Sequence, residues 1–153
     1  MEKIIGELLK RKNFTISCAE SCTGGLLTSK LTDVAGSSAY VKGAVVSYTD
    51  EIKKNVLHVN AETLENFTAV SEQTAREMAT NIRQLLKSDI GVSITGYAGP
   101  GGGTAENPVG TVYIGISDKN GDKVWRFNFS GTRTEIKEKV VAAALNLIKK
   151  HLI

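Results

Sequence analysis

The alternation of helical and strand patterns along the chain constrains its fold more than any other feature. Helical periodicity or helix-start signals predict helices over Glu2 to Lys12, Gly24 to Asp33, Glu51 to Leu57, Ser71 to Lys87 and Thr132 to Leu152. Apolar and β-rich runs predict strands over Thr15 to Ala19, Ala44 to Tyr48, Ile90 to Thr95, Thr111 to Ser117 and Lys123 to Phe129. Elements in this order build an α/β fold, in which helices cover both faces of one sheet.

Polar residues mark where several of these helices begin. Asp50 is expected to cap the helix that starts at Glu51. Thr132 and Glu135 have the spacing of a capping box, in which each side chain satisfies a backbone N–H of the other residue. A further helical turn is expected over Ala61 to Asn66.

The connections between the strands fix their directions. Right-handed crossovers make the first three strands parallel. Lys119 to Asp122 contains an Asn-Gly pair, which favours a tight hairpin, so the fourth strand runs against the third and the fifth is parallel to the first three. Ligands of open α/β sheets bind at the carboxyl ends of the parallel strands. The loops expected at that edge are Ser21, Tyr48 to Lys53, Gly96 to Gly110 and Gly131 to Arg133.

Length and composition indicate one globular domain over residues 1–153, with 41% hydrophobic and 23% charged residues. The formal charge of +3 is small and the basic residues do not cluster, which argues against a nucleic-acid groove. No segment is long and apolar enough to span a membrane. Cys18 and Cys22 lie around a tight turn and are expected to be free thiols, so we expect a cytoplasmic protein. Two cysteines and two distant histidines offer no recognised metal-ligand spacing.

The segment Ala19 to Gly25 joins the first strand to the next helix and holds three possible nucleophiles, Ser21, Cys22 and Thr23. A strand-to-helix turn of this kind exposes a side chain at the sheet edge, and glycine lets backbone N–H groups approach a ligand. The segment therefore suggests catalysis or anion binding. The alternative is that Ser21 or Thr23 only caps the helix.

A base for such a nucleophile is not a histidine, because His58 and His151 both lie away from the predicted edge. Lys53 is the lysine nearest that edge. A partly buried lysine near a helix N-terminus has its ammonium form disfavoured, so it can act as a base near neutral pH. The alternative is an ordinary solvated lysine.

The glycine-rich loop that starts at Gly96 lacks the Gly-Lys-Ser/Thr ending of a P-loop. Its backbone N–H groups can approach an oxyanion or a phosphate, or the loop is only a flexible connection. Arg133 stands one residue after the Thr132 cap, where a guanidinium and a helix start together favour an anion. The alternative is a solvated arginine.

Seven motifs in order along the chain resemble the CinA C-terminal domain family. They are Cys18 to Gly25, Asp33 to Ser38, Val46-Ser47-Tyr48 with Lys53, Ala69 to Ser71, Ser93 to Gly96 with Ala98 to Pro100, Pro108 to Val112, and Ser130 to Arg133. The resemblance implies a three-layer α/β/α domain with a five-stranded mixed sheet. It also implies hydrolysis of nicotinamide mononucleotide to nicotinate mononucleotide and ammonia in pyridine nucleotide recycling, without a metal or organic cofactor.

Roles carried over by this resemblance are expectations for this chain. Ser21 would attack the amide carbon, Lys53 would accept its proton, and Tyr48 would orient Lys53 or bind the substrate. Arg133 would bind the phosphate. The remaining substrate-binding residues, which include the candidate oxyanion donors, would be Glu20, Thr23, Gly24, Gly25, Gly96, Ala98 and Gly99.

Other functions are compatible with the same motifs. The family's association with competence or DNA damage suggests a non-catalytic nucleotide-binding or interaction module. An amidase acting on another pyridine or nucleotide amide is a third possibility. The expected partners are a small nucleotide substrate and a second copy of the chain in a homo-oligomer, a dimer.

Overall fold

The strands form one sheet in the order β2-β1-β3-β4-β5 in the computed structural model, which describes residues 1–153. The strands are β1 (Ile16–Glu20), β2 (Val41–Val46), β3 (Ile90–Gly96), β4 (Thr111–Asp118) and β5 (Gly121–Asn128). The helices are α1 (Glu2–Lys12), α2 (Leu26–Thr32), α3 (Asp50–Asn55), α4 (Ala61–Phe67), α5 (Glu72–Leu86) and α6 (Arg133–Leu152), with a short 3₁₀ turn, η1 (Ser37–Ala39).

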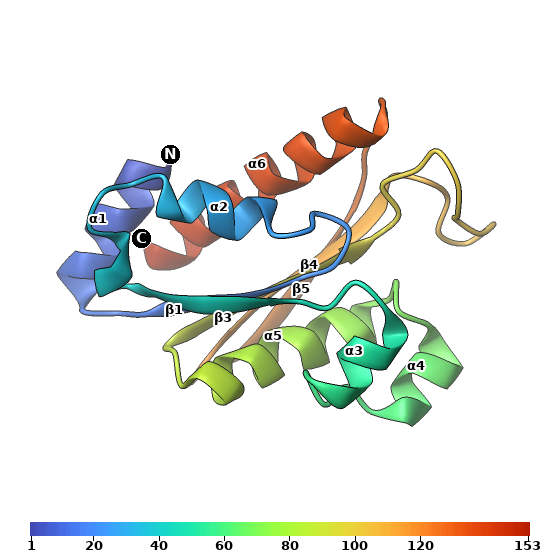
Figure 1. Ribbon diagram of the computed structural model, residues 1–153, viewed down its shortest axis with the longest axis horizontal. Coiled ribbons are helices and arrows are strands. Elements are labelled where there is room, and N and C mark those ends of the chain that lie inside the picture. Colours follow the sequence, from blue (N-terminus) through green and yellow to red (C-terminus); the bar gives the residue numbers. More distant parts are fainter.

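Helices cover both faces of the sheet, as the alternating pattern predicts. Helices α1, α2 and α6 lie on one face and α3, α4 and α5 on the other (Figure 1). The larger apolar core lies under α1, α2 and α6 and the smaller one, which includes Ala19 and Met78, under α5. The α/β class and the three layers are therefore confirmed.

The strand directions also agree with the prediction. Strand β1 pairs in parallel with both β2 and β3, whereas β4 is antiparallel to β3 and to β5. Only β4 therefore runs against the others. The carboxyl ends of β1, β2, β3 and β5 meet at the same edge, where four loops converge.

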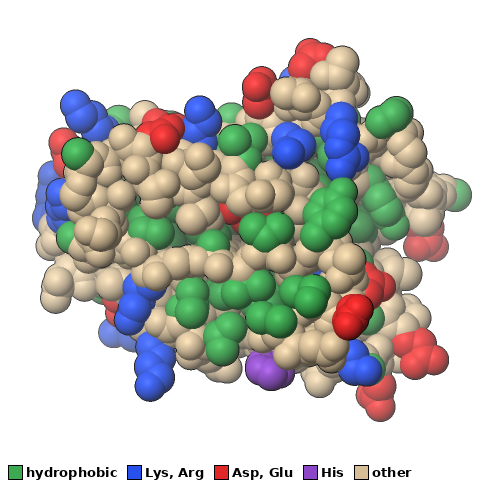
Figure 2. All heavy atoms as spheres, viewed as in Figure 1, with side chains coloured by type: hydrophobic (Ala, Val, Ile, Leu, Met, Phe, Trp, Pro, Cys, Tyr) green, Lys and Arg blue, Asp and Glu red, His purple; other side chains and the backbone are tan.

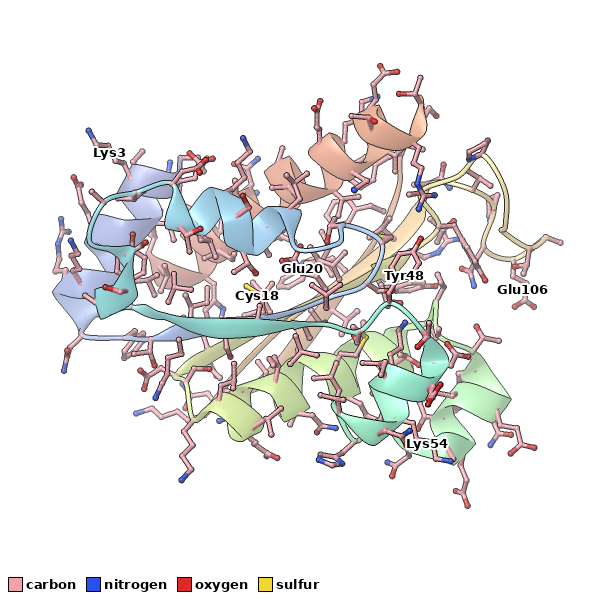
Figure 3. The ribbon with its side chains drawn as sticks, viewed as in Figure 1. Lys3, Cys18, Glu20, Tyr48, Lys54 and Glu106 are labelled. Atoms are coloured by element: carbon pink, nitrogen blue, oxygen red, sulfur yellow. The ribbon has the colours of Figure 1, made fainter.

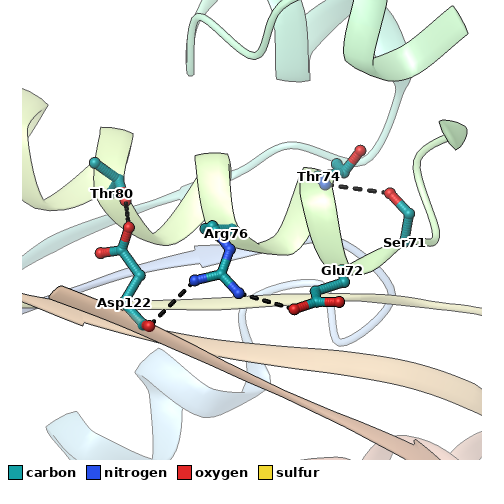
Figure 4. Close-up of polar contacts among 6 residues, drawn as sticks. All are labelled: Ser71, Glu72, Thr74, Arg76, Thr80 and Asp122. Carbon is teal, nitrogen blue, oxygen red and sulfur yellow. Dashed lines mark hydrogen bonds and ion pairs between the residues drawn. The ribbon is translucent and has the colours of Figure 1, made fainter. Parts of the chain in front are cut away.

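Side-chain caps and cross-layer contacts hold the long helices in place. Ser71 accepts a hydrogen bond from the backbone N–H of Thr74 at the start of α5, and Thr132 and Glu135 form the predicted capping box of α6. Figure 4 shows that α5 also reaches the hairpin: Thr80 donates to the Asp122 carboxylate at 2.8 Å, and Arg76 donates to the Asp122 carbonyl. These contacts fix α5 across the sheet.

Some local predictions differ from the structure. Thr49, not Asp50, is the N-cap of α3, because the Thr49 hydroxyl accepts from the Ile52 N–H and Asp50 already lies in the first turn. The segment from Ala61 is a helix of 7 residues. The hairpin loop is Lys119-Asn120, and Gly121 begins β5 with a φ of 140°.

The second strand begins at Val41 and ends at Val46, earlier than the predicted Ala44 to Tyr48. It is the edge strand β2, and its side chains alternate between half-buried and exposed. Figure 2 shows hydrophobic side chains gathered over this edge and the neighbouring helices, and Val46, Val56 and Leu85 are among the exposed apolar residues. The homo-oligomer expected from the sequence stays a prediction.

None of the helices combines the length and the low polarity that crossing a bilayer requires. The location in the cytoplasm stays a prediction.

Candidate active site

The turn after β1 brings Ser21 to the sheet edge. The backbone N–H of Ser21 still donates to the Ile94 carbonyl of β3 at 3.0 Å, so the residue continues the parallel ladder. The chain then reverses through Gly24 and Gly25, whose φ values of 61° and 102° are costly for residues with a side chain. The turn thus leaves Ser21 almost buried, with 6% of its surface exposed, at the start of a helix.

Glu20 holds this turn together from below. Its carboxylate is fully buried and accepts hydrogen bonds from the Thr23 hydroxyl, the Leu27 N–H, and both the N–H and the hydroxyl of Thr28. A carboxylate at the first turn of a helix also interacts favourably with the helix dipole. The Glu20 carboxylate and the Thr23 hydroxyl are thus engaged within the protein, where they position the turn. That Glu20 and Thr23 also bind substrate stays a prediction.

We expect Glu20→Gln to destabilise the protein by about 3 kcal/mol, because the amide nitrogen would face backbone N–H and hydroxyl donors that now meet an anionic oxygen. Chemical denaturation measures this change in the free energy of unfolding. Glu138→Gln, on an exposed part of α6, is the matched control and should leave it unchanged. Equal stabilities of the two variants would show that the carboxylate does not hold the turn.

Lys53 reaches Ser21 from α3. Its side chain is 2% exposed, and its Nζ lies 3.1 Å from Ser21 Oγ and donates to the Ser47 carbonyl at 2.9 Å. Burial lowers the pKa of Lys53, while Asp50 and Cys22 oppose this shift. No carboxylate forms an ion pair with Lys53. The structure therefore brings a candidate nucleophile and a candidate base together from segments 32 residues apart.

Arg133 links two other loops at the same edge. Its Nη1 donates to the Gly99 carbonyl at 2.6 Å and its Nη2 to the Tyr48 hydroxyl at 2.8 Å. Tyr48 therefore contacts Arg133 and not Lys53, so the suggestion that it orients the lysine is not supported. Figure 3 shows Tyr48 and Glu20 at the same end of the sheet, while Cys18 lies further back along β1.

A pocket of about 260 Å³ lies at this edge, and Lys53 stands behind Ser21 without lining it. Its lining residues are Ser21, Cys22, Tyr48, Gly96, Tyr97, Ala98, Gly99, Gly101 and Arg133. Gly24 and Gly25 shape the turn but do not line the pocket. Tyr97 and Cys22 are lining residues that the sequence did not single out as ligand contacts, although both stand beside predicted site residues.

Several backbone N–H groups of the turn are free to bind a ligand. Gly24 donates to the Ser21 carbonyl and is not one of them. The N–H groups of Thr23 and Gly25 donate to no group of the protein, and the N–H of Cys22 has no partner outside its own residue. The residue after a nucleophile commonly supplies an oxyanion donor, so Cys22 is the first candidate.

The cysteine beside Ser21 is poorly suited to nucleophilic attack. Burial raises the pKa of the Cys22 thiol to about 11, so little thiolate is present at neutral pH. Neither histidine is near the pocket: His151 pairs with Asp118 at 2.8 Å, and His58 lies near Asn81 and Leu85. No group of three or more potential metal-ligating side chains occurs in the structure.

A second, larger groove of about 730 Å³ lies between the start of α5 and the loop around Asn107. Its walls include Phe67, Tyr113 and Arg126. It contains no contact between a nucleophile and a base, so the smaller pocket is the candidate active site.

Comparison with known proteins gives a consistent result. A family model described as the CinA C-terminal domain matches residues 1–152. A CinA-like protein of Endomicrobium trichonymphae is 48% identical over 153 residues, which cover 100% of this chain and 36% of that protein. A CinA-like protein of Thermotoga neapolitana is 45% identical over 152 residues, which cover 99% of this chain and 37% of that protein. The chain thus spans about a third of the length of these relatives.

Solved structures of similar chains have the same fold. Competence damage-inducible protein A from Klebsiella pneumoniae superposes with a TM-score of 0.96 at 36% identity, covering 99% of this chain and 94% of that chain. A competence or damage-inducible protein from Enterobacter asburiae has a TM-score of 0.96 at 36% identity, covering 99% of this chain and 96% of that chain. Together with the whole-chain match to the family model, these likenesses show that this chain belongs to the CinA C-terminal domain family.

Proposed function

We propose that this domain is a nucleotide amidase that hydrolyses the carboxamide of nicotinamide mononucleotide to nicotinate mononucleotide and ammonia. The observation that carries the proposal is the buried contact of 3.1 Å between Lys53 Nζ and Ser21 Oγ beside the pocket. The substrate is the one that membership of the CinA C-terminal domain family implies. Arg133, which lines the same pocket, supports a ligand with an anionic group.

In the first half of the reaction, neutral Lys53 accepts the hydroxyl proton as Ser21 Oγ attacks the amide carbon. The carbonyl oxygen becomes an oxyanion, and the backbone N–H of Cys22, a residue that lines the pocket, is the donor proposed to stabilise it. Lys53 then gives the proton to the amide nitrogen, the C–N bond breaks and ammonia leaves. The product is an ester between Ser21 and the nicotinate carbonyl.

In the second half, water replaces ammonia. Lys53 accepts a proton from the water as its oxygen attacks the ester carbon, and the proton then goes to Ser21 Oγ as the ester bond breaks. The net reaction consumes one water and restores the free serine and the neutral lysine.

The direct test is to incubate the purified protein with nicotinamide mononucleotide and to measure ammonia and nicotinate mononucleotide. Stoichiometric release of both products supports the amidase. If the protein binds the nucleotide without turnover, the second candidate is favoured, a nucleotide-binding module linked to competence or DNA damage. The names of the structural relatives, which mention competence and damage, are the observation behind that candidate. Turnover of a different pyridine amide alone would instead reassign the substrate.

Arg133 provides a test of phosphate recognition. A charge-assisted contact contributes roughly 1.5 to 3 kcal/mol, which corresponds to about one to two orders of magnitude in discrimination. We therefore expect Arg133→Ala to lower kcat/KM for nicotinamide mononucleotide by that factor, and to leave kcat/KM for nicotinamide riboside nearly unchanged.

The matched control is Arg126→Ala, which removes an exposed arginine in the larger groove. Equal losses on the mononucleotide and the riboside in Arg133→Ala would show that Arg133 acts on the amide chemistry or on the fold. In that case it does not bind the phosphate.

A further inference from the structure

Ser47 carries one of only two buried side-chain polar atoms that have no hydrogen-bond partner, the other being the Tyr40 hydroxyl. Ser47 is fully buried and follows the last residue of β2. An unpaired buried hydroxyl is destabilising, and such groups are rare in folded proteins. The position of this one, beside the candidate active site, calls for a functional explanation.

The sheet register places Ser47 next to Ser21. The last paired residues of β1 and β2 are Glu20 and Val46, and the Ser47 N–H donates to the Glu20 carbonyl at 2.8 Å. Ser47 and Ser21 are therefore the next pair along the two strands. Neighbouring strands lie about 4.8 Å apart, and residues in register point to the same face. Both serines thus stand on the face that α3 and Lys53 cover.

Lys53 already contacts both residues of this pair. Its Nζ contacts Ser21 Oγ and donates to the carbonyl of Ser47, so the unpaired Ser47 hydroxyl belongs to the residue that binds the lysine through its backbone. Rotation of the Ser47 side chain about its Cα–Cβ bond moves the hydroxyl among three staggered positions without disturbing the ladder.

The count of hydrogen bonds changes when Lys53 takes up a proton. A neutral amine has two N–H groups and one lone pair, and the lone pair accepts the proton of the Ser21 hydroxyl. The ammonium has three N–H groups and no lone pair. Ser21 Oγ and the Ser47 carbonyl can accept two of these N–H groups, which leaves the third unpaired in a site where Lys53 is 2% exposed.

We propose that the Ser47 hydroxyl accepts the third N–H of the Lys53 ammonium that forms during catalysis, and so acts as a positioning residue for the base. This inference rests on the proposed function, because it assigns Lys53 a proton. It explains why a hydroxyl without a partner in the resting state is kept at this point of the fold.

The test compares Ser47→Val with Ser47→Thr, since these variants have nearly the same shape and only threonine keeps the hydroxyl. The pKa of Lys53 is followed by NMR titration of lysine labelled at Cε, with Lys53→Met to assign the signal. We expect Ser47→Val to lower this pKa by about one unit and to reduce kcat by roughly ten- to a hundredfold with little change in KM, whereas Ser47→Thr retains both. The pH at which activity rises should shift with the pKa.

The groups that act on Lys53 are Asp50 on its own helix and Cys22 across the turn, with Arg133 acting on Cys22 from α6. All three stay in place in the Ser47 variants. Ser17→Ala is the control, because Ser17 is a buried serine on the same face of β1 whose hydroxyl already pairs with Ser88. It should leave the pKa of Lys53 unchanged.

The titration needs no substrate, so the two proposals can fail separately. If the wild type does not hydrolyse the nucleotide but Ser47→Val still shifts the pKa of Lys53, the proposed amidase function is wrong. The hydrogen bond between Ser47 and Lys53 is then still supported. If folded Ser47→Val and Ser47→Thr have the same Lys53 pKa and the same pH profile, Ser47 only fills space and the inference is overturned.

Discussion

Ser21→Ala should reduce amide hydrolysis by roughly four to six orders of magnitude while the protein stays folded. The size of the effect follows from the chemistry, because alanine offers no oxygen to form the ester with the nicotinate carbonyl. The fold should survive, since the Ser21 hydroxyl forms a hydrogen bond with Lys53 alone, while the backbone hydrogen bond from Ser21 to Ile94 remains. The measurement is the rate of ammonia release together with the thermal unfolding curve.

Cys22→Ala is the matched control for this variant. The thiol stands next to Ser21 in the chain and also lines the pocket, but its raised pKa leaves it protonated at neutral pH. We expect Cys22→Ala to retain most of the activity. Quenched wild-type reactions should give an acyl adduct that peptide mass spectrometry assigns to Ser21. An adduct on Cys22, or loss of turnover in Cys22→Ala with normal turnover in Ser21→Ala, would reverse the assignment of the nucleophile.

Lys53→Met should lower kcat by on the order of 10²- to 10⁴-fold and remove the rise of activity with pH. The rise is expected because only neutral Lys53 accepts the Ser21 proton. Burial lowers the pKa of Lys53 in the folded protein, so the midpoint of this rise should lie below the ordinary lysine pKa of about 10.4. Lys54→Met is the control, since Lys54 is exposed on the same helix.

The same shift gives a stability test with a definite sign. The unfolded chain holds the Lys53 proton more tightly than the folded protein, so it binds more protons between the lowered and the ordinary pKa. The folded wild type should therefore gain stability relative to Lys53→Met as the pH rises through this range, and lose it as the pH falls. Parallel stability curves for the two proteins would mean that Lys53 is not a desolvated amine. If Lys53→Met hydrolysed the amide as fast as the wild type does, a residue other than Lys53 would have to be the base.

The residue pattern was sufficient to predict most of the architecture. Helical spacing and apolar runs depend on local geometry, so the elements were found with shifts of a few residues at their ends. The Asn120-Gly121 hairpin signal gave the antiparallel direction of β4 because turn preference is also local. The boundaries of β2 were missed because it is an edge strand with an apolar, partly exposed sequence that does not mark where pairing ends.

The candidate site was predictable as a set of loops but not as a set of contacts. The rule that ligands bind at the carboxyl ends of parallel strands brought Ser21, Lys53 and Arg133 to one edge. It could not show that the Tyr48 hydroxyl accepts a hydrogen bond from Arg133 instead of contacting Lys53. Nor could it show that the Glu20 carboxylate accepts hydrogen bonds from the turn that follows Ser21. Both depend on side-chain directions that arise only when separate elements pack together.

The sequence by itself determined the order of the elements, the strand directions and the residue types at the sheet edge, since these follow from periodicity and turn chemistry between near neighbours. The tertiary structure alone decided which of the residues at this edge contact one another. Lys53 is buried against Ser21 because α3 folds back under the end of β1, and Ser47 stands beside Ser21 because the register of β1 and β2 places it there. Such contacts join residues far apart in the chain, and their distances follow from the packing of the whole sheet.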